Sequence, residues 1–209
     1  MRVIPAILAK DKHEYIEKLR IVEKFSDHVQ IDIMDGIFVP NETVSIRQLQ
    51  DIKTPLKLII HSMVSHPLSD LSYYLNLKPQ TIIYHIESED DIQTLIKNTS
   101  AYGVSVGLAV NPDTEIKKIR RFLQSIQEIL IMTVYPGFSG QVFIADQLRK
   151  VPDLRTYKND ILVSVDGGVT LHNIKISKLM GVDIVYSASN IFSHPKPQEA
   201  YNGLVRAAS

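Results

Sequence analysis

The stretch Val29-Gln30-Ile31-Asp32-Ile33-Met34-Asp35-Gly36 is a short, mostly apolar run that ends in a carboxylate and a glycine. Similar apolar runs recur along the whole chain, and most of them are apolar at successive positions rather than at alternate ones. Continuous runs of this kind are typical of strands buried on both faces, as in parallel sheets. The eight runs are Val3–Leu8, Val29–Ile33, Leu56–Ile60, Thr81–Tyr84, Val104–Val110, Ile129–Val134, Ile161–Val165 and Ile184–Tyr186.

Segments with the apolar period of a helix lie between these runs. The period over 116–126 is an example, and Asp113 and Thr114 stand where its cap is expected; Pro40–Asp51 is short and has room for one poor helix. Eight strand–helix alternations predict an α/β fold, a (β/α)₈ TIM barrel near its lower size limit. An open doubly wound sheet is the alternative, but no G-x-G-x-x-G follows an early strand. No linker is visible, so we expect residues 1–209 to form a single barrel domain.

Composition excludes several classes of protein. The 209 residues contain 23 Lys and Arg and 23 Asp and Glu, so the net charge is zero and provides no field that would attract nucleic acid. There is no cysteine, hence no disulfide framework and no thiolate zinc site. No apolar stretch has the length of a signal core or a membrane span. We therefore expect a cytoplasmic protein without a membrane or nucleic-acid partner.

Three residues that could carry chemistry end three of the predicted strands. In a barrel of this type the functional groups lie at the carboxyl ends of the strands, so Asp32, His61 and Asp166 are expected to meet at one mouth. Two carboxylates and an imidazole can hold a divalent transition metal, and two carboxylates can also move a proton across a carbon. Taken singly, each residue has a plainer interpretation, since Asp at a strand end often caps a turn and His in an apolar run is often a core residue. His85 also ends a predicted strand, but no role is assigned to it.

Small residues follow the last three predicted strands. Gly137-Phe138-Ser139-Gly140, Gly167-Gly168 and Ser187-Ala188-Ser189 would let backbone N–H groups approach an anion, and barrels commonly bind phosphate at this place. Ordinary turns are the alternative interpretation of each segment. Met34, Met63 and Met132 end or follow apolar runs, where methionine usually fills the core.

At these positions the sequence resembles the ribulose-phosphate 3-epimerase family, over almost the whole chain and in the same order. The most specific motif is Asp32-Ile33-Met34-Asp35-Gly36 together with Phe38-Val39-Pro40-Asn41. The other matching motifs are Pro5-Ala6-Ile7-Leu8, His61-Ser62-Met63-Val64, Asn111-Pro112, Pro136-Gly137-Phe138-Ser139-Gly140-Gln141 and Val165-Asp166-Gly167-Gly168-Val169.

The resemblance implies a ribulose-phosphate-binding barrel and an isomerase of the pentose phosphate pathway, which interconverts ribulose 5-phosphate and xylulose 5-phosphate. Asp32 and Asp166 would be the acid/base pair at C3, and a divalent metal (Zn, Fe or Mn) held by Asp32, His61 and Asp166 would stabilise the enediolate. It also implies a homo-oligomer. The substrate- and phosphate-binding residues implied are His61, Met34, Met63, Met132, Gly137, Phe138, Ser139, Gly140, Gly167, Gly168, Ser187, Ala188 and Ser189.

The chain departs from the family's pattern around this site. Gln30 stands at the fourth metal-ligand position, where the family has a His, and a neutral amide oxygen is a poorer ligand for zinc or iron. Ala6 replaces a substrate-contacting Ser, Ile59 replaces a typical Asp ahead of His61, and Ser187-Ala188-Ser189 replaces the usual phosphate contact. Two other hypotheses therefore stay open: an epimerase of another ketose phosphate, such as a ketohexose 6-phosphate, and a non-catalytic phosphosugar-binding paralogue with a degraded metal site.

Overall fold

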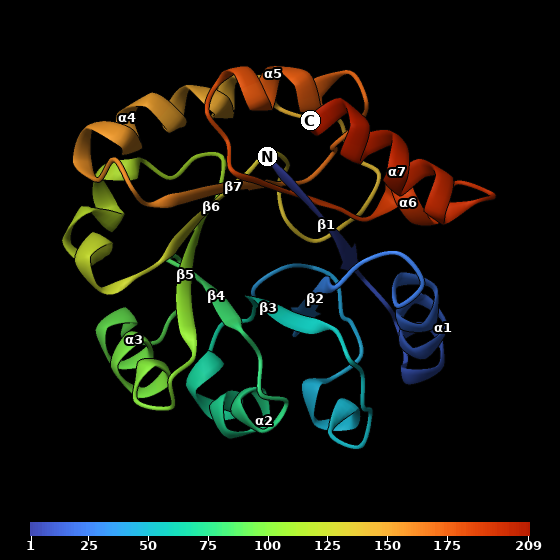
Figure 1. Ribbon diagram of the computed structural model, residues 1–209. Coiled ribbons are helices and arrows are strands. Elements are labelled where there is room, and N and C mark those ends of the chain that lie inside the picture. Colours follow the sequence, from blue (N-terminus) through green and yellow to red (C-terminus); the bar gives the residue numbers. More distant parts are fainter.

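The computed structural model describes residues 1–209 and contains eight parallel strands that close into a barrel in chain order, with helices around the outside (Figure 1). The predicted (β/α)₈ barrel is confirmed. Each predicted run coincides with a strand, to within a few residues at the ends. The strands are β1 (Arg2–Ile7), β2 (His28–Met34), β3 (Lys57–Met63), β4 (Thr81–His85), β5 (Ser105–Val110), β6 (Glu128–Met132), β7 (Leu162–Asp166) and β8 (Ile184–Ser187).

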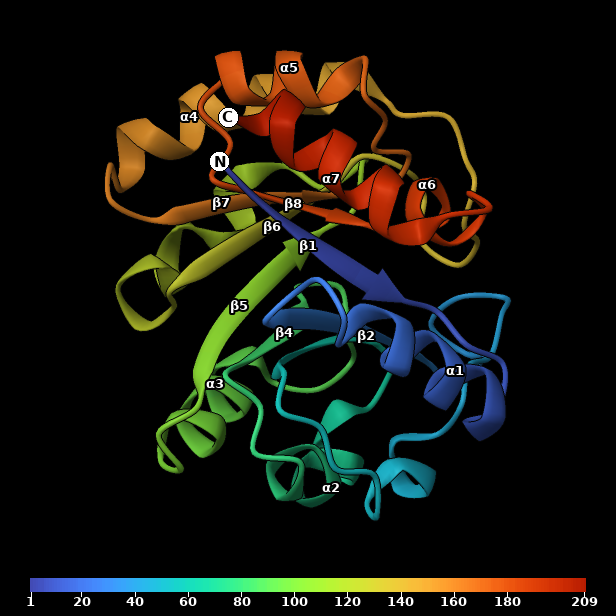
Figure 2. The same ribbon diagram turned by 45° about the vertical axis from the view of Figure 1, so that its right-hand side comes forward.

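The helical layer mixes α-helices with shorter 3₁₀ segments. The α-helices are α1 (Lys12–Val22), α2 (Leu71–Asn76), α3 (Ile92–Ser100), α4 (Lys150–Tyr157), α5 (Asn173–Leu179), α6 (Ser189–Phe192) and α7 (Pro197–Ala208). The 3₁₀ helices are η1 (Ile46–Leu49), η2 (Pro67–Asp70), η3 (Ile116–Ser125) and η4 (Ala145–Arg149). Both views place the two ends of the chain near each other, where α7 packs against β1 (Figures 1 and 2). No helix is both long and apolar enough to cross a bilayer.

Two sequence expectations for the helices can be compared with this layer. The segment 40–51 contains only the four-residue helix η1, as expected. The expected cap at Asp113 and Thr114 is wrong, because η3 is preceded by Glu115 and receives no side-chain cap. Thr114 is buried and its side chain hydrogen-bonds to Glu87 instead. The hydroxyl that the local pattern assigned to the helix cap therefore makes a tertiary contact.

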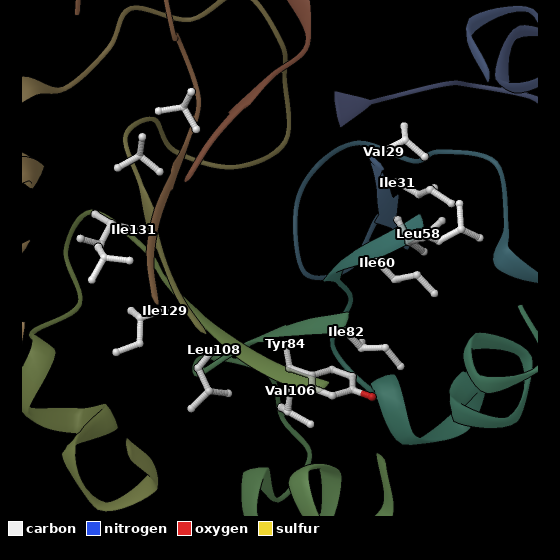
Figure 3. Packing of buried hydrophobic residues seen from close by; sticks show 14 of the residues in the cluster. Val29, Ile31, Leu58, Ile60, Ile82, Tyr84, Val106, Leu108, Ile129 and Ile131 are labelled. Atoms are coloured by element: carbon white, nitrogen blue, oxygen red, sulfur yellow. The ribbon is translucent and has the colours of Figure 1, made fainter. Parts of the chain in front are cut away.

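The strands are apolar on both faces because each face meets a separate core. The larger core lies between strands and helices, and Figure 3 shows strand side chains such as Ile31, Ile60 and Leu108 pointing into it. The smaller core fills the barrel interior. Its members are Ile4, Ala6, Ile59, Ile83, Ala109, Leu130, Met132, Val134, Ile184 and Tyr186. Burial on both faces explains why the runs are continuous rather than alternating.

Strand register decides which side chains stand side by side above the inner core. Gln30 of β2 is level with Ala6 of β1 on one side and Ile59 of β3 on the other. Two residues further along, Asp32 is level with His61. Side chains two positions apart on a strand share a face, so this register stacks the Gln30 row directly beneath the Asp32 row at the mouth.

Candidate active site at the barrel mouth

Asp32, His61 and Asp166 meet at the carboxyl ends of β2, β3 and β7. His61 Nδ1 lies 3.1 Å from Asp32 Oδ1 and 3.6 Å from Asp166 Oδ2. One ligand atom from each residue can be chosen so that all three atoms lie within 4.8 Å of one another. The residues expected to meet do so, and they form a compact cluster of two carboxyls and one imidazole.

Burial and mutual charge set the protonation of this cluster. Burial raises the pKa of Asp32, and the neighbouring charge of Asp166 adds to that effect. Burial also opposes protonation of His61, but its hydrogen bond to Asp32 and the negative charges of Asp32 and Asp166 outweigh burial and raise its pKa to about 9. His61 is therefore a cation at neutral pH when no metal is bound, held between two acids that would attract any cation placed there.

Gln30 joins the two carboxyls from below. Its Nε2 donates to Asp32 Oδ1 at 2.9 Å and to Asp166 Oδ2 at 2.6 Å. Its Oε1 is fully buried and has no hydrogen-bond partner, because the side chains level with it belong to Ala6 and Ile59. A buried carbonyl without a donor is costly, on the order of 1–3 kcal/mol, so this atom points to a missing partner.

His85 and Glu87 form a second layer behind His61. His61 Nε2 lies 2.9 Å from His85 Nε2, and His85 Nδ1 lies 3.2 Å from Glu87 Oε2. Burial lowers the pKa of His85 to about 4, so its ring is neutral. The pKa of Glu87 is lowered although burial opposes this, because His85, Thr114 and the Asn111 backbone all hydrogen-bond to the carboxylate. The sequence interpretation missed Glu87; its signal was the spacing of two from His85 at a strand end.

A pocket opens above the cluster, with about 510 Å³ of empty space when the open solvent at its entrance is included. Every residue predicted to bind substrate or phosphate lines it, together with Asp32 and Asp166, while Gln30 lies beneath. The predicted residues brought together there are Met34, His61, Met63, Met132, Gly137, Phe138, Ser139, Gly140, Gly167, Gly168, Ser187, Ala188 and Ser189. The sequence interpretation missed five further lining residues, which are Leu8, Val134, Pro136, Val169 and Tyr186.

Close backbone packing holds the loops after β6 and β7 around the pocket. Gly168 has φ +66°, and a Cβ there would lie 2.7 Å from both Gln141 O and Phe143 N, so only glycine fits. Thr133 Oγ1 donates to the carbonyls of Asp166 and Gly167, at 2.8 Å and 2.6 Å. These contacts fix the loop that follows β7 relative to the Asp166 carboxyl.

Comparison with known proteins identifies the family. A sequence model described as "Ribulose-phosphate 3 epimerase family" matches residues 2–192. The chain belongs to this family. The ribulose-phosphate 3-epimerase of Chlamydia pneumoniae is 34% identical over 185 residues, which are 85% of this chain and 81% of that protein. The Helicobacter pylori protein of the same name is 32% identical over 210 residues, covering 98% and 96% of the two chains.

Membership in the ribulose-phosphate 3-epimerase family makes the chain an isomerase of the carbohydrate-epimerase class. Among solved structures, the 3-hexulose-6-phosphate synthase of Salmonella typhimurium superposes with a TM-score of 0.73 at 15% identity, over 100% of this chain and 98% of that one. At that identity the similarity concerns the barrel fold alone.

The cluster fits the divalent metal that the epimerase family implies. Ligands bound to tetrahedral zinc at roughly 2.0–2.2 Å stand roughly 3.4 Å from one another, and the two distances from His61 Nδ1 to the carboxyl oxygens, 3.1 Å and 3.6 Å, lie on either side of that value. The donor set of two carboxylates and one imidazole suits zinc, iron or manganese. The unpartnered Oε1 of Gln30 also lies beside the cluster. Asp32, His61 and Asp166 could therefore hold a metal.

Proposed function

We propose that this protein interconverts ribulose 5-phosphate and xylulose 5-phosphate, with Asp32 and Asp166 as the acid/base pair at C3. One observation carries the proposal: the two carboxyls approach from β2 and β7, line the same pocket and share the Gln30 amide as a hydrogen-bond donor. Carboxyls from strands on different sides of a barrel mouth can reach opposite faces of one substrate carbon.

In this mechanism one carboxylate removes the C3 proton, and the electron pair of the C–H bond moves toward the C2 carbonyl oxygen to form an enediolate. The opposite carboxyl then returns a proton to the other face of C3, which inverts the carbon. Burial raises the pKa of Asp32, which makes its carboxylate a stronger base. Met34, Met63 and Met132 line the pocket and exclude water while the proton is exchanged.

A divalent cation (Zn, Fe or Mn) held by Asp32, His61 and Asp166 would stabilise the negative charge that develops on the substrate oxygens. We further propose Gln30 as the fourth ligand. Rotation of its amide by a half turn would exchange Nε2 for Oε1 and supply the partner that Oε1 now lacks. Without a cation the same rotation would place a carbonyl against two carboxylates, so the amide faces them with its N–H groups.

The loops after β6, β7 and β8 are the proposed phosphate site. Ser139, Gly140, Gly168 and Ser189 all line the end of the pocket built by these loops. Backbone N–H groups of small residues, together with the hydroxyls, suit a phosphate dianion. This assignment places the sugar over Asp32 and its phosphate over the small-residue loops.

The test is exchange at C3 in D₂O. Purified protein is incubated with ribulose 5-phosphate, with and without added Zn²⁺, Fe²⁺ or Mn²⁺, and C3 is followed by proton NMR. Deuterium entering C3 with formation of xylulose 5-phosphate is the expected result. Asp166→Asn should slow exchange by about 10²- to 10⁴-fold, the contribution typical of a positioned acid/base group. Asp51→Asn is the matched control, since Asp51 is an exposed surface residue paired with Lys12.

A second candidate is a phosphosugar-binding protein without catalysis, and Gln30 is the observation that favours it. An amide that occupies both carboxyls with its N–H groups could also keep them from the substrate. Binding of ribulose 5-phosphate without C3 exchange under any metal condition would refute the epimerase and favour this candidate. Exchange with a ketohexose 6-phosphate alone would retain the chemistry and change the substrate. A homo-oligomeric state, a cytoplasmic location and a single domain remain predictions.

A further inference from the structure

A row of hydrogen bonds leads away from the mouth behind His61. The backbone N–H of Asn111 donates to Glu87 Oε1 at 2.9 Å. The other carboxyl oxygen, Oε2, lies 3.2 Å from His85 Nδ1, and His85 Nε2 lies 2.9 Å from His61 Nε2. The row therefore starts at a backbone group, whose donor role is fixed, and ends at the imidazole that faces Asp32.

The chemistry of the groups gives every bond in the row one direction. A carboxylate can only accept, so His85 must carry its hydrogen on Nδ1 and donate it to Glu87. The neutral ring of His85 then has a lone pair on Nε2, which accepts from the Nε2–H of His61. With its Nε2 committed as a donor, a neutral His61 has its free lone pair on Nδ1.

We propose that Glu87, acting through His85, sets the tautomer of His61 so that the Nδ1 lone pair faces Asp32 and Asp166 and can bind a divalent cation. Glu87 and His85 are positioning residues in this scheme, since neither one touches the reacting carbon. The inference rests on the metal site proposed above. It extends that site by two residues and says how the Glu87 carboxylate, near the start of the row, governs metal affinity at His61, where the row ends.

Packing around the row keeps the two rings in line. The rings of His61 and His85 lie with centroids 5.1 Å apart and planes 21° from parallel. Phe38 covers His85 with its ring centroid at 4.8 Å. Lys150 Nζ donates to the carbonyls of Asn111 and Pro112, at 3.0 Å and 2.9 Å, and so holds the backbone whose N–H starts the row.

Glu87→Gln is the decisive variant because it reverses the row with little change in shape. Its Oε1 would still accept from the Asn111 N–H, which leaves the amide NH₂ facing His85 Nδ1. His85 would then carry its hydrogen on Nε2 and donate it to His61 Nε2, and a neutral His61 would hold its own hydrogen on Nδ1. The nitrogen that faces the carboxylates would no longer offer a lone pair.

His85→Gln is the complementary variant. A glutamine there can accept from the His61 Nε2–H with its oxygen and donate to Glu87 with its nitrogen, which preserves the original direction. We expect this variant to retain more of the wild-type metal affinity than Glu87→Gln does. Glu89→Gln is the matched charge control, because the Glu89 side chain is exposed and contacts only His66 among the basic groups.

The experiment has two readouts, neither of which is catalysis. In metal-free protein labelled with ¹⁵N-histidine and kept at about pH 10, where the His61 ring with its pKa of about 9 is neutral, two-bond ¹⁵N–¹H spectra report which nitrogen of His85 carries the hydrogen. Competition with a chromophoric chelator gives the Zn²⁺ dissociation constant. We expect the wild type to show Nδ1–H at His85, Glu87→Gln to show Nε2–H, and the Zn²⁺ dissociation constant of that variant to rise by about 10- to 100-fold.

Each alternative result has a separate meaning. Wild-type Nε2–H at His85, or an unchanged Zn²⁺ dissociation constant in Glu87→Gln, would overturn the proposal. The same loss of affinity in Glu89→Gln would overturn it as well, because a general charge effect would then explain the result. If Glu87→Gln does not fold, a His85→Gln variant with a wild-type Zn²⁺ constant supports the directed row, and one that binds no Zn²⁺ overturns it. Zn²⁺ that fails to bind the wild type would instead refute the metal site, while the His85 spectrum still reports the row.

Discussion

On one side of the Asp32–Asp166 pair, His61 has a partner at each ring nitrogen, whereas on the other side Gln30 leaves its carbonyl oxygen without one. The His61 side continues outward through His85 and Glu87 to a backbone N–H. The Gln30 side stops at once, because its neighbours in the sheet are Ala6 and Ile59, which offer no polar atom.

Three of the departures that the sequence resemblance implied lie at this difference. Ala6, Gln30 and Ile59 are scattered in the sequence, yet they form one row across β1, β2 and β3. A change from imidazole to amide at the middle of the row removes the need for a carboxylate partner at Ile59. Three of the four departures thus lie in one row beneath the Asp32–His61–Asp166 cluster, and the fourth, Ser187-Ala188-Ser189, lies at the carboxyl end of β8.

The largest effect on metal binding and activity is expected on the His61 side, where each ring nitrogen has a partner. His61→Leu removes the proposed imidazole ligand and leaves two carboxyls facing each other, so Zn²⁺ binding should be lost. Epimerisation should fall by at least about 100-fold, since metal charge stabilisation is worth several kcal/mol. Metal content after dialysis and the rate of xylulose 5-phosphate formation measure both. His66→Leu, at an exposed histidine, should retain both; a metal-loaded and active His61→Leu would contradict the cluster.

An intermediate effect is expected from rebuilding the Gln30 side. Gln30→His alone should tighten Zn²⁺ binding only modestly, because its second ring nitrogen would meet Ile59. The double variant Gln30→His, Ile59→Asp supplies that nitrogen with an acceptor and should tighten binding by a further 10- to 100-fold, roughly the known weight of such partners. The measurement is the Zn²⁺ dissociation constant of the wild type, of Gln30→His, of Ile59→Asp and of the double variant. Equal constants throughout would show that residue 30 does not contact the metal.

Much of this arrangement was predictable from sequence, and the limit has a physical origin. Continuous apolar runs required strands buried on two faces, and the residues that end those runs had to share one mouth. Strand register is different, since it is set by packing across strands rather than by pattern within one. The link between Ala6, Gln30 and Ile59 was therefore hidden, although each departure was visible on its own.

Glu87 was missed for a similar reason. It lies past the end of β4, where local pattern suggests only a polar turn, and its partners come from His85 and from the Asn111 backbone of a different strand end. The direction of a row of hydrogen bonds depends on all of its members together, so it cannot be predicted from any single residue in the sequence.

The smallest effect tests the unpartnered oxygen itself. Ala6→Ser places a hydroxyl level with Gln30, where it can donate to Oε1, and should raise the free energy of unfolding of the metal-free protein by about 1 kcal/mol. Ala9→Ser makes the same change at a buried alanine just after β1, within the larger apolar core between strands and helices. Among those apolar side chains the hydroxyl should destabilise the protein by about 1–3 kcal/mol. Urea unfolding at one pH measures both. Equal losses in the two variants would mean that Gln30 Oε1 already has a partner, which would remove the asymmetry between the two sides of the site.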